Sequence, residues 1–214
     1  MTVDARPLDD GGPTDGPPVD AAPVNVTLSQ TTSPALVSPA SIACGNNADN
    51  TTAENSWYRV FRLDDAGVTR DLNVISVSFG VQDAEGQPQV QVKLGTYTGS
   101  TQPPPTQLVT TQITPLATTS FTVPNITSTA PMMVNVPISA TVPAGSQLVV
   151  EVFAPDFAGT GKMFWIGGNT SGESAPSYVR APSCSIAQPQ SVQMVASGAG
   201  ITPPHLVITV QGSY

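Results

Sequence analysis

Residues 56–65, "SWYRVFRLDD", bring together side chains that could bind a ligand. Trp57, Tyr58 and Phe61 stand beside Arg59 and Arg62, although the whole chain has only seven lysine and arginine residues. A guanidinium next to aromatic rings can hold a sugar or an acidic ligand. The alternative is a core strand, with an arginine on each face whose stem covers apolar surface and whose head pairs with a carboxylate. Asp64, Asp65 and Asp71 are the candidate carboxylate partners.

Aromatic rings provide the flat apolar platforms on which sugars stack, so carbohydrate or another surface ligand is the predicted partner. The alternative is that these rings belong to the core, and exposure of two or more on one concave face would favour binding. The predicted ligand-binding residues are Trp57, Tyr58, Arg59, Arg62, Trp165 and Tyr178.

The asparagine-rich stretch "CGNNADN", residues 44–50, is a candidate calcium site. Calcium takes oxygen ligands from carboxylates, amides and backbone carbonyls, and the spacing here is not that of an EF-hand loop. An asparagine-rich turn is the alternative, and no other cofactor is expected. Zinc is excluded because one histidine and two distant cysteines do not form a cluster. The candidate calcium ligands are Asn46, Asn47, Asp49 and Asn50.

The signatures of common catalytic sites are missing, so the chain is not expected to be an enzyme. His205 is the only histidine, and no G-x-S-x-G motif accompanies it. The glycine-rich "GGNTSGES", residues 167–174, lacks the Gly-Lys-Ser/Thr ending of a phosphate-binding loop and is expected to be an ordinary loop. The carboxylates lie mostly in loops, and no pair of them stands out for glycoside hydrolysis.

Charge and hydropathy exclude several partners. Only 10% of the residues are charged, and the net charge is −8. A chain that is acidic and has no basic cluster is a poor ligand for nucleic acid or for an anionic membrane. No run of eighteen apolar residues is present, so no transmembrane segment is predicted.

Cys44 and Cys184 are the only cysteines, and they predict one disulfide that closes a loop of about 140 residues. Two free buried thiols are the alternative. A disulfide implies an oxidising compartment, so the chain is expected to be exported and to act outside the cell or at its surface. The residues after Met1 contain no apolar segment of a signal peptide, and 9–23 resemble the spacer that follows a lipoprotein or secretion signal.

Alternation of apolar and polar residues predicts an all-β fold. The period of two is clear at 25–30, 73–81, 89–94, 132–142, 148–154 and 206–210, and at 56–63. In 73–81 it places Ile75, Val77, Phe79 and Val81 on one face. Ten to twelve strands, each with one wet face, predict an antiparallel β-sandwich, jelly-roll-like in its topology, with a barrel as the alternative. No helix longer than about one turn is expected.

The domain organisation follows from a shift in composition near residue 24. Residues 1–24 are rich in proline, glycine and aspartate and predict a disordered or extended tail or linker. Residues 25–214 are predicted to form a single β-sandwich domain.

Three segments together resemble an accessory β-sandwich module found in bacterial secreted and surface proteins: "NSWYRVFRL", "VPISATVPAGSQLVVEVFAPD" and "FWIGGNTSGESAPSYVRAPSC". The resemblance covers about residues 25–212 and implies an extracellular, non-catalytic fold. It assigns no ligand and no site residues.

Two functions are consistent with these features. The first is a non-catalytic surface module for binding or adhesion, with carbohydrate as its ligand. The second is a structural subunit of a filament, coat or matrix, in which the N-terminal extended segment adds a strand to the sheet edge of another copy. The sequence favours the first by a narrow margin.

Overall fold

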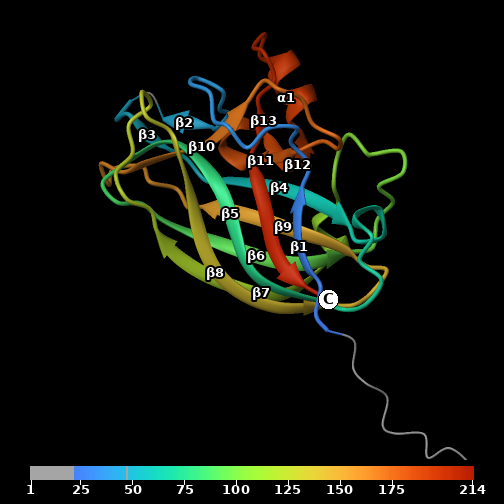
Figure 1. Ribbon diagram of the computed structural model, residues 1–214. Coiled ribbons are helices and arrows are strands. Elements are labelled where there is room, and N and C mark those ends of the chain that lie inside the picture. Colours follow the sequence, from blue (N-terminus) through green and yellow to red (C-terminus); the bar gives the residue numbers. More distant parts are fainter. Residues whose placement is uncertain (1–21, 47) are drawn as a thin grey trace, which may run out of the picture.

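The computed structural model describes residues 22–46 and 48–214, and it shows two packed antiparallel sheets (Figure 1). The antiparallel β-sandwich predicted from the sequence is confirmed. Most of the predicted tail, 1–24, lies outside the described residues. The two-residue strands are β2 (Gly45–Asn46), β3 (Thr51–Thr52) and β13 (His205–Leu206). The longer ones are β1 (Asn25–Ser29), β4 (Asn55–Arg62), β5 (Leu72–Glu85), β6 (Gln89–Tyr97), β7 (Ile113–Thr122), β8 (Met132–Val142), β9 (Gln147–Ala154), β10 (Met163–Asn169), β11 (Tyr178–Ala181), β12 (Ile186–Ser191) and β14 (Ile208–Ser213).

The first sheet is built around the long strand β5. Its order is β1-β14-β5-β10-β13, and β8 pairs with the other side of β5. Strand β14 pairs with β5 from Asn73 to Phe79, and β10 takes over from Gly80 onward. These two strands therefore share one side of β5, and β1 forms the margin of the sheet beside β14 (Figure 1).

The second sheet has the order β12-β11-β4-β9-β6-β7. Strand β4 pairs with β9 along its whole length, from Asn55 to Arg62. On its other side β4 pairs with β11 at only three residues, Ser56, Trp57 and Tyr58. The last residues of β4 are therefore paired on one side only among the described strands.

The core lies between the two sheets and comes from alternate residues of each strand. In β4 the side chains of Trp57 and Phe61 point into it, whereas Tyr58 and Val60 belong to a second apolar cluster on the outer face. Trp57 packs edge-on against Phe164, which packs edge-on against Phe79. The alternation predicted for 56–63 is thus confirmed.

The alternation predicted for 73–81 is wrong at two positions, Val74 and Ile75, because Val74 lies in the core with Val77. Ile75 is 56% exposed, while Val74 and Val77 are buried. The pairing of β5 with β8 shifts register between Val74 and Ser76, and such a bulge reverses the face on which the following residues lie. A period of two read across the bulge therefore assigns both Val74 and Ile75 to the wrong face.

The expectation that no helix exceeds about one turn is also wrong. Helix α1 spans Val192–Gly198, and the Ser191 hydroxyl accepts a hydrogen bond from the Met194 N–H as its N-cap. Val192 and Ala196 are buried, so the helix packs one short face onto the sandwich. Three single-turn 3-10 helices accompany it: η1 (Asp64–Ala66), η2 (Thr110–Gln112) and η3 (Pro182–Cys184).

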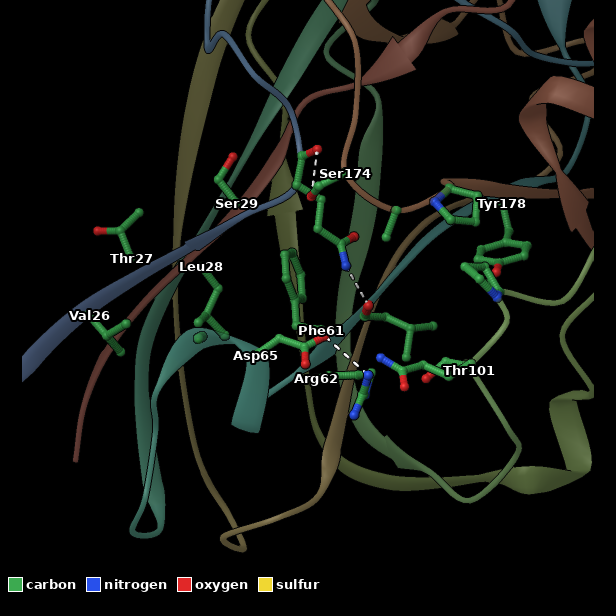
Figure 2. Close-up of a pocket in the computed structure, with 17 residues that line it drawn as sticks. Val26, Thr27, Leu28, Ser29, Phe61, Arg62, Asp65, Thr101, Ser174 and Tyr178 are labelled. Atoms are coloured by element: carbon green, nitrogen blue, oxygen red, sulfur yellow. Dashed lines mark hydrogen bonds and ion pairs between the residues drawn. The ribbon is translucent and has the colours of Figure 1, made fainter.

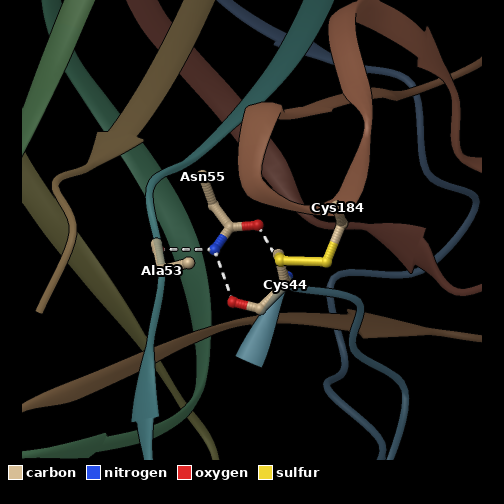
Figure 3. Close-up of a disulfide and its surroundings, with 4 residues drawn as sticks. All are labelled: Cys44, Ala53, Asn55 and Cys184. Atoms are coloured by element: carbon tan, nitrogen blue, oxygen red, sulfur yellow. Dashed lines mark hydrogen bonds between the residues drawn. A yellow bond between two sulfur atoms is a disulfide. The ribbon is translucent and has the colours of Figure 1, made fainter. Parts of the chain in front are cut away.

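The predicted disulfide Cys44–Cys184 is confirmed (Figure 3). Asn55, a buried residue at the start of β4, holds the Cys44 backbone in place. Its side-chain oxygen accepts the Cys44 N–H at 2.7 Å, and its amide donates to the carbonyls of Cys44 and Ala53 at 3.1 and 2.8 Å. The bridge therefore ties the segment between β1 and β2 to η3, the turn after β11. Over the described part of the chain, no helix has the length and apolarity to cross a membrane.

Candidate functional site

A groove of about 660 Å³ lies on the flank of the sandwich (Figure 2). One wall is β1, and the facing wall is formed by the last residues of β4, 60–62, together with η1. The rim comes from two loops. The lining segments are residues 26–30, 60–62, 65–66, 101, 102, 104, 174–176 and 178.

The groove exists because β11 leaves β4 early. Continued pairing would place the segment before Tyr178 beside Val60, but Pro176 lies there and has no N–H to donate. The segment instead crosses to the other sheet, where the Ser174 N–H donates to the Gln30 carbonyl at 2.8 Å. The Gln30 side chain turns toward β4 and donates to the Val60 carbonyl at 2.7 Å. The groove thus runs beside a strand edge that no strand of the described residues covers.

The interior of the groove combines apolar and polar surface. Leu28 and Phe61 are each 3% exposed and form apolar parts of the lining. Arg62 is the only cation in the lining, and its guanidinium lies 3.3 Å from the Asp65 carboxylate. The other polar side chains are uncharged hydroxyls and amides: Thr27, Ser29, Gln30, Thr101, Gln102 and Ser174. This lining can donate and accept hydrogen bonds over an apolar base.

A buried ion pair supports the rim of the groove. The Arg59 side chain has no exposed surface and lies 2.9 Å from the Glu173 carboxylate. The same guanidinium donates to the carbonyls of Ala175, at 2.6 Å, and Leu206, at 2.5 Å. Burial lowers the pKa of Arg59, while the charge of Glu173 acts in the opposite direction. Arg59 therefore links β4, the rim and the opposite sheet.

The structure buries the three rings of the predicted set nearest the groove. Trp57 has no exposed surface, and its Nε1–H donates to the Ile42 carbonyl at 2.8 Å. Tyr58 and Tyr178 are 3% and 2% exposed and pack with Leu108 on the outer face of the second sheet. Burial raises the pKa of both tyrosine hydroxyls.

Two members of the predicted set, Arg62 and Tyr178, line the groove, and the others do not. Trp165 is partly exposed on β10, beside Gly45. Arg59 lies inside the sandwich and acts on the rim through Glu173. The sequence correctly placed an arginine on each face of this strand. Ligand binding by the set as a whole stays a prediction.

Sequence reasoning missed the polar residues that face Arg62 across the groove. Gln30, Thr101 and Gln102 lie in segments far from β4 in the chain, so no local spacing connects them with Arg62. Proline offered the only signal, because Pro103–Pro105 and Pro176 mark two loops that cannot continue a sheet.

The described part of the candidate calcium site, Asn46 and 48–50, is held by hydrogen bonds within the protein. Asp49 Oδ1 accepts from the Thr51 hydroxyl at 2.5 Å, and Oδ2 accepts from the Gly159 N–H at 2.7 Å. The hydroxyl bond lowers the pKa of Asp49. Asn46 accepts from the Ala48 N–H, Asn50 has a left-handed backbone (φ 56°), and Asn47 lies outside the described residues.

Both carboxylate oxygens of Asp49 therefore take part in hydrogen bonds within the protein. Within residues 22–46 and 48–214, no three histidine, cysteine, aspartate or glutamate side chains cluster as metal ligands. Calcium binding at this turn stays a prediction.

Comparison with known proteins adds a likeness of fold. No family model and no curated protein matches the chain. A solved structure of a variant of the clostridial cysteine protease Cwp84, after propeptide cleavage, matches with a TM-score of 0.52 and 16% identity. The match covers 88% of this chain and 40% of that one, so the chain corresponds to less than half of the protease chain. At this identity the likeness concerns the fold alone.

Proposed function

We propose that this chain is a non-catalytic binding module that is exported by a bacterium and holds a carbohydrate in the groove between β1 and β4. The observation that carries the proposal is the lining of the groove. It combines apolar surface at Leu28 and Phe61 with uncharged hydroxyl and amide side chains and a single ion pair.

Carbohydrate matches this lining better than other ligand classes do. A sugar has apolar C–H faces and many hydroxyls that both donate and accept, and amide and hydroxyl side chains can do the same. An anionic ligand would find only Arg62 in the groove, already paired with Asp65, on a chain of net charge −8. A neutral sugar avoids that repulsion.

Two features support a role outside the cell. The disulfide Cys44–Cys184 is stable where the environment is oxidising. The low content of charged residues and the resemblance to secreted bacterial modules agree with export. The likeness of fold to part of Cwp84 is consistent with a domain that accompanies others.

The groove favours binding without catalysis. Glycoside hydrolysis requires two carboxyl groups flanking the scissile bond. Asp65 is the only carboxylate in the lining, and it pairs with Arg62. A ligand held here therefore meets hydrogen-bonding groups and no second acid.

The first test is a screen of the purified chain against immobilised neutral and acidic glycans, followed by calorimetry on any glycan retained. Arg62→Ala and Gln102→Ala should each weaken binding, by about tenfold or more for Arg62, because a hydrogen bond to a charged group contributes about 1.5–3 kcal/mol. Ser139→Ala, at an exposed position of β8 that does not line the groove, is the matched control and should bind as the parent does.

The proposal fails if no glycan is retained, or if the groove variants and the control bind alike. Thermal unfolding of each variant shows whether a loss of binding reflects loss of fold.

A further inference from the structure

Strand β1 has an open backbone edge. The Val24 N–H donates to the Tyr214 carbonyl, and the Tyr214 N–H donates to Val24, so even-numbered residues of this strand bond to β14. In antiparallel pairing, the alternate, odd-numbered residues direct their N–H and C=O groups away from the paired strand. Asn25, Thr27 and Ser29 therefore present six backbone groups to the side away from β14, where no described strand lies.

That open edge borders the groove. All five residues 26–30 line it, rather than alternate ones, so β1 meets the groove with its edge and not with one face. The groove of about 660 Å³ leaves room beside the strand (Figure 2).

The other outer strands carry devices that prevent pairing with another chain, and β1 does not. Natural sheets protect their edges with proline, charge or bulges. Strand β7 contains Pro115, β8 contains Pro137 and β12 contains Pro189. Register shifts occur where β7 pairs with β6 and where β8 pairs with β5, and the outer strand β13 has only two residues. The sequence of β1, NVTLS, has no proline and no charge, and its five pairs with β14 are in continuous register.

We propose that β1 pairs with β1 of a second copy of this chain, antiparallel and about a two-fold axis at Thr27. Thr27 then faces Thr27 of the second copy, and Asn25 faces Ser29. The six open backbone groups of each copy would be satisfied by the other, and the first sheet would continue from one copy into the next.

The side chains at this edge are self-complementary. Asn25, Thr27 and Ser29 lie on one face, where Thr–Thr and Asn–Ser pairs form hydrogen bonds across strands. None of these side chains is charged. Although each copy has a net charge of −8, no like charges therefore face each other within the strand pair. A larger ligand in the groove would compete with the second copy, but the pairing does not depend on the carbohydrate function.

Light scattering of the full chain over a wide concentration range tests the proposal. The parent should move from 22.0 kDa toward twice that mass as its concentration rises. Thr27→Lys places two like charges on the axis and should remain monomeric, as should Thr27→Glu. An equimolar mixture of these two variants should recover the dimer, because opposite charges then meet. Ser139→Lys, on the same sheet face at β8, is the matched control and should dimerise as the parent does.

Cysteine cross-linking gives a second readout that does not require a folded lysine variant. Opposite residues of a hydrogen-bonded pair have Cα atoms about 5.5 Å apart, within the range of a disulfide. Thr27→Cys should cross-link to itself under mild oxidation. Asn25→Cys and Ser29→Cys should cross-link to each other when mixed, and much less when each is alone.

Three results overturn the proposal. One is a parent chain that stays monomeric at every concentration. Another is a dimer that persists unchanged in Thr27→Lys. The third is a dimer that vanishes when residues 1–21 are removed while Thr27→Lys leaves it intact, since the N-terminal segment would then be the strand that docks.

Discussion

The guanidinium of Arg59, completely buried, lies 2.9 Å from the Glu173 carboxylate, and this contact ties β4 to the rim of the groove. The guanidinium also donates to Ala175 in the rim and to Leu206 in the opposite sheet. A charge in this position is tolerated only because its partners are in place. The core of the sandwich and the shape of the groove therefore depend on the same side chain.

Glu173→Gln should lower the free energy of unfolding by about 1–3 kcal/mol, because it leaves a buried guanidinium without its counter-charge. Denaturant titration measures the change. Glu54→Gln is the matched control, since Glu54 pairs at 2.6 Å with Arg180 at the surface, where both side chains are about one-third exposed. An exposed pair contributes about 0–1 kcal/mol. Equal effects at both sites would contradict the structural role assigned to Arg59.

Removal of the disulfide by Cys44→Ser with Cys184→Ser should destabilise the chain by up to about 4–5 kcal/mol, since the bridge spans 140 residues and its loss frees the unfolded chain. The melting temperatures of the parent and the double variant give the comparison. In reductant, the melting temperature of the parent should approach that of the double variant. The double variant itself is the control, because its melting temperature should not change when reductant is added. A double variant as stable as the oxidised parent would show that the Asn55 contacts suffice without the bridge.

Tyr58 and Tyr178 should resist ionisation in alkali, because burial raises the pKa of both hydroxyls, and Glu151 adds to the effect at Tyr58. Because the pKa of each hydroxyl in the folded chain lies above the unfolded value of 10.0, the two protonated hydroxyls stabilise the fold fully below about pH 10. This stabilisation is lost as the pH rises further, because the unfolded chain then binds fewer protons than the folded one.

Absorbance at 295 nm during a pH titration tests this prediction. The folded parent should show at least two ionised tyrosines fewer than the unfolded chain until alkaline unfolding begins. Tyr58→Phe with Tyr178→Phe should leave the early part of the curve unchanged. An early part that shrinks in the double variant would mean that these hydroxyls are accessible.

Gly212→Ala should destabilise the fold by about 1–3 kcal/mol through overpacking. Gly212 lies where β14 shifts register against β5, and an added Cβ would lie 2.6 Å from the Asn73 carbonyl oxygen. Gly198→Ala, at the end of α1 with nothing within 4 Å, is the control, and it should be neutral or slightly stabilising. Thermal unfolding separates the two, and similar melting temperatures would contradict the close approach at Gly212.

The sequence alone determined the class of fold, because alternation of apolar and polar residues reflects the geometry of a single strand. Residues 56–63 show this well: the period of two placed Trp57 and Phe61 on one face, which the structure shows to be the core face, and an arginine on each face. The two cysteines predicted the bridge between Cys44 and Cys184 because no other pairing within the chain was available.

Only the tertiary structure decided what those residues contact. The bulge near Ile75 depends on pairing between β5 and β8, which no local pattern records. Glu173 and Gln30 reach β4 from distant segments, so spacing could not identify them as partners of Arg59 and Val60. The groove arises where Pro176 stops β11 from covering β4, and the open edge of β1 arises from the order of the strands. Local sequence specifies the faces of strands, and the assembly of the sheets determines which edges and cavities remain open.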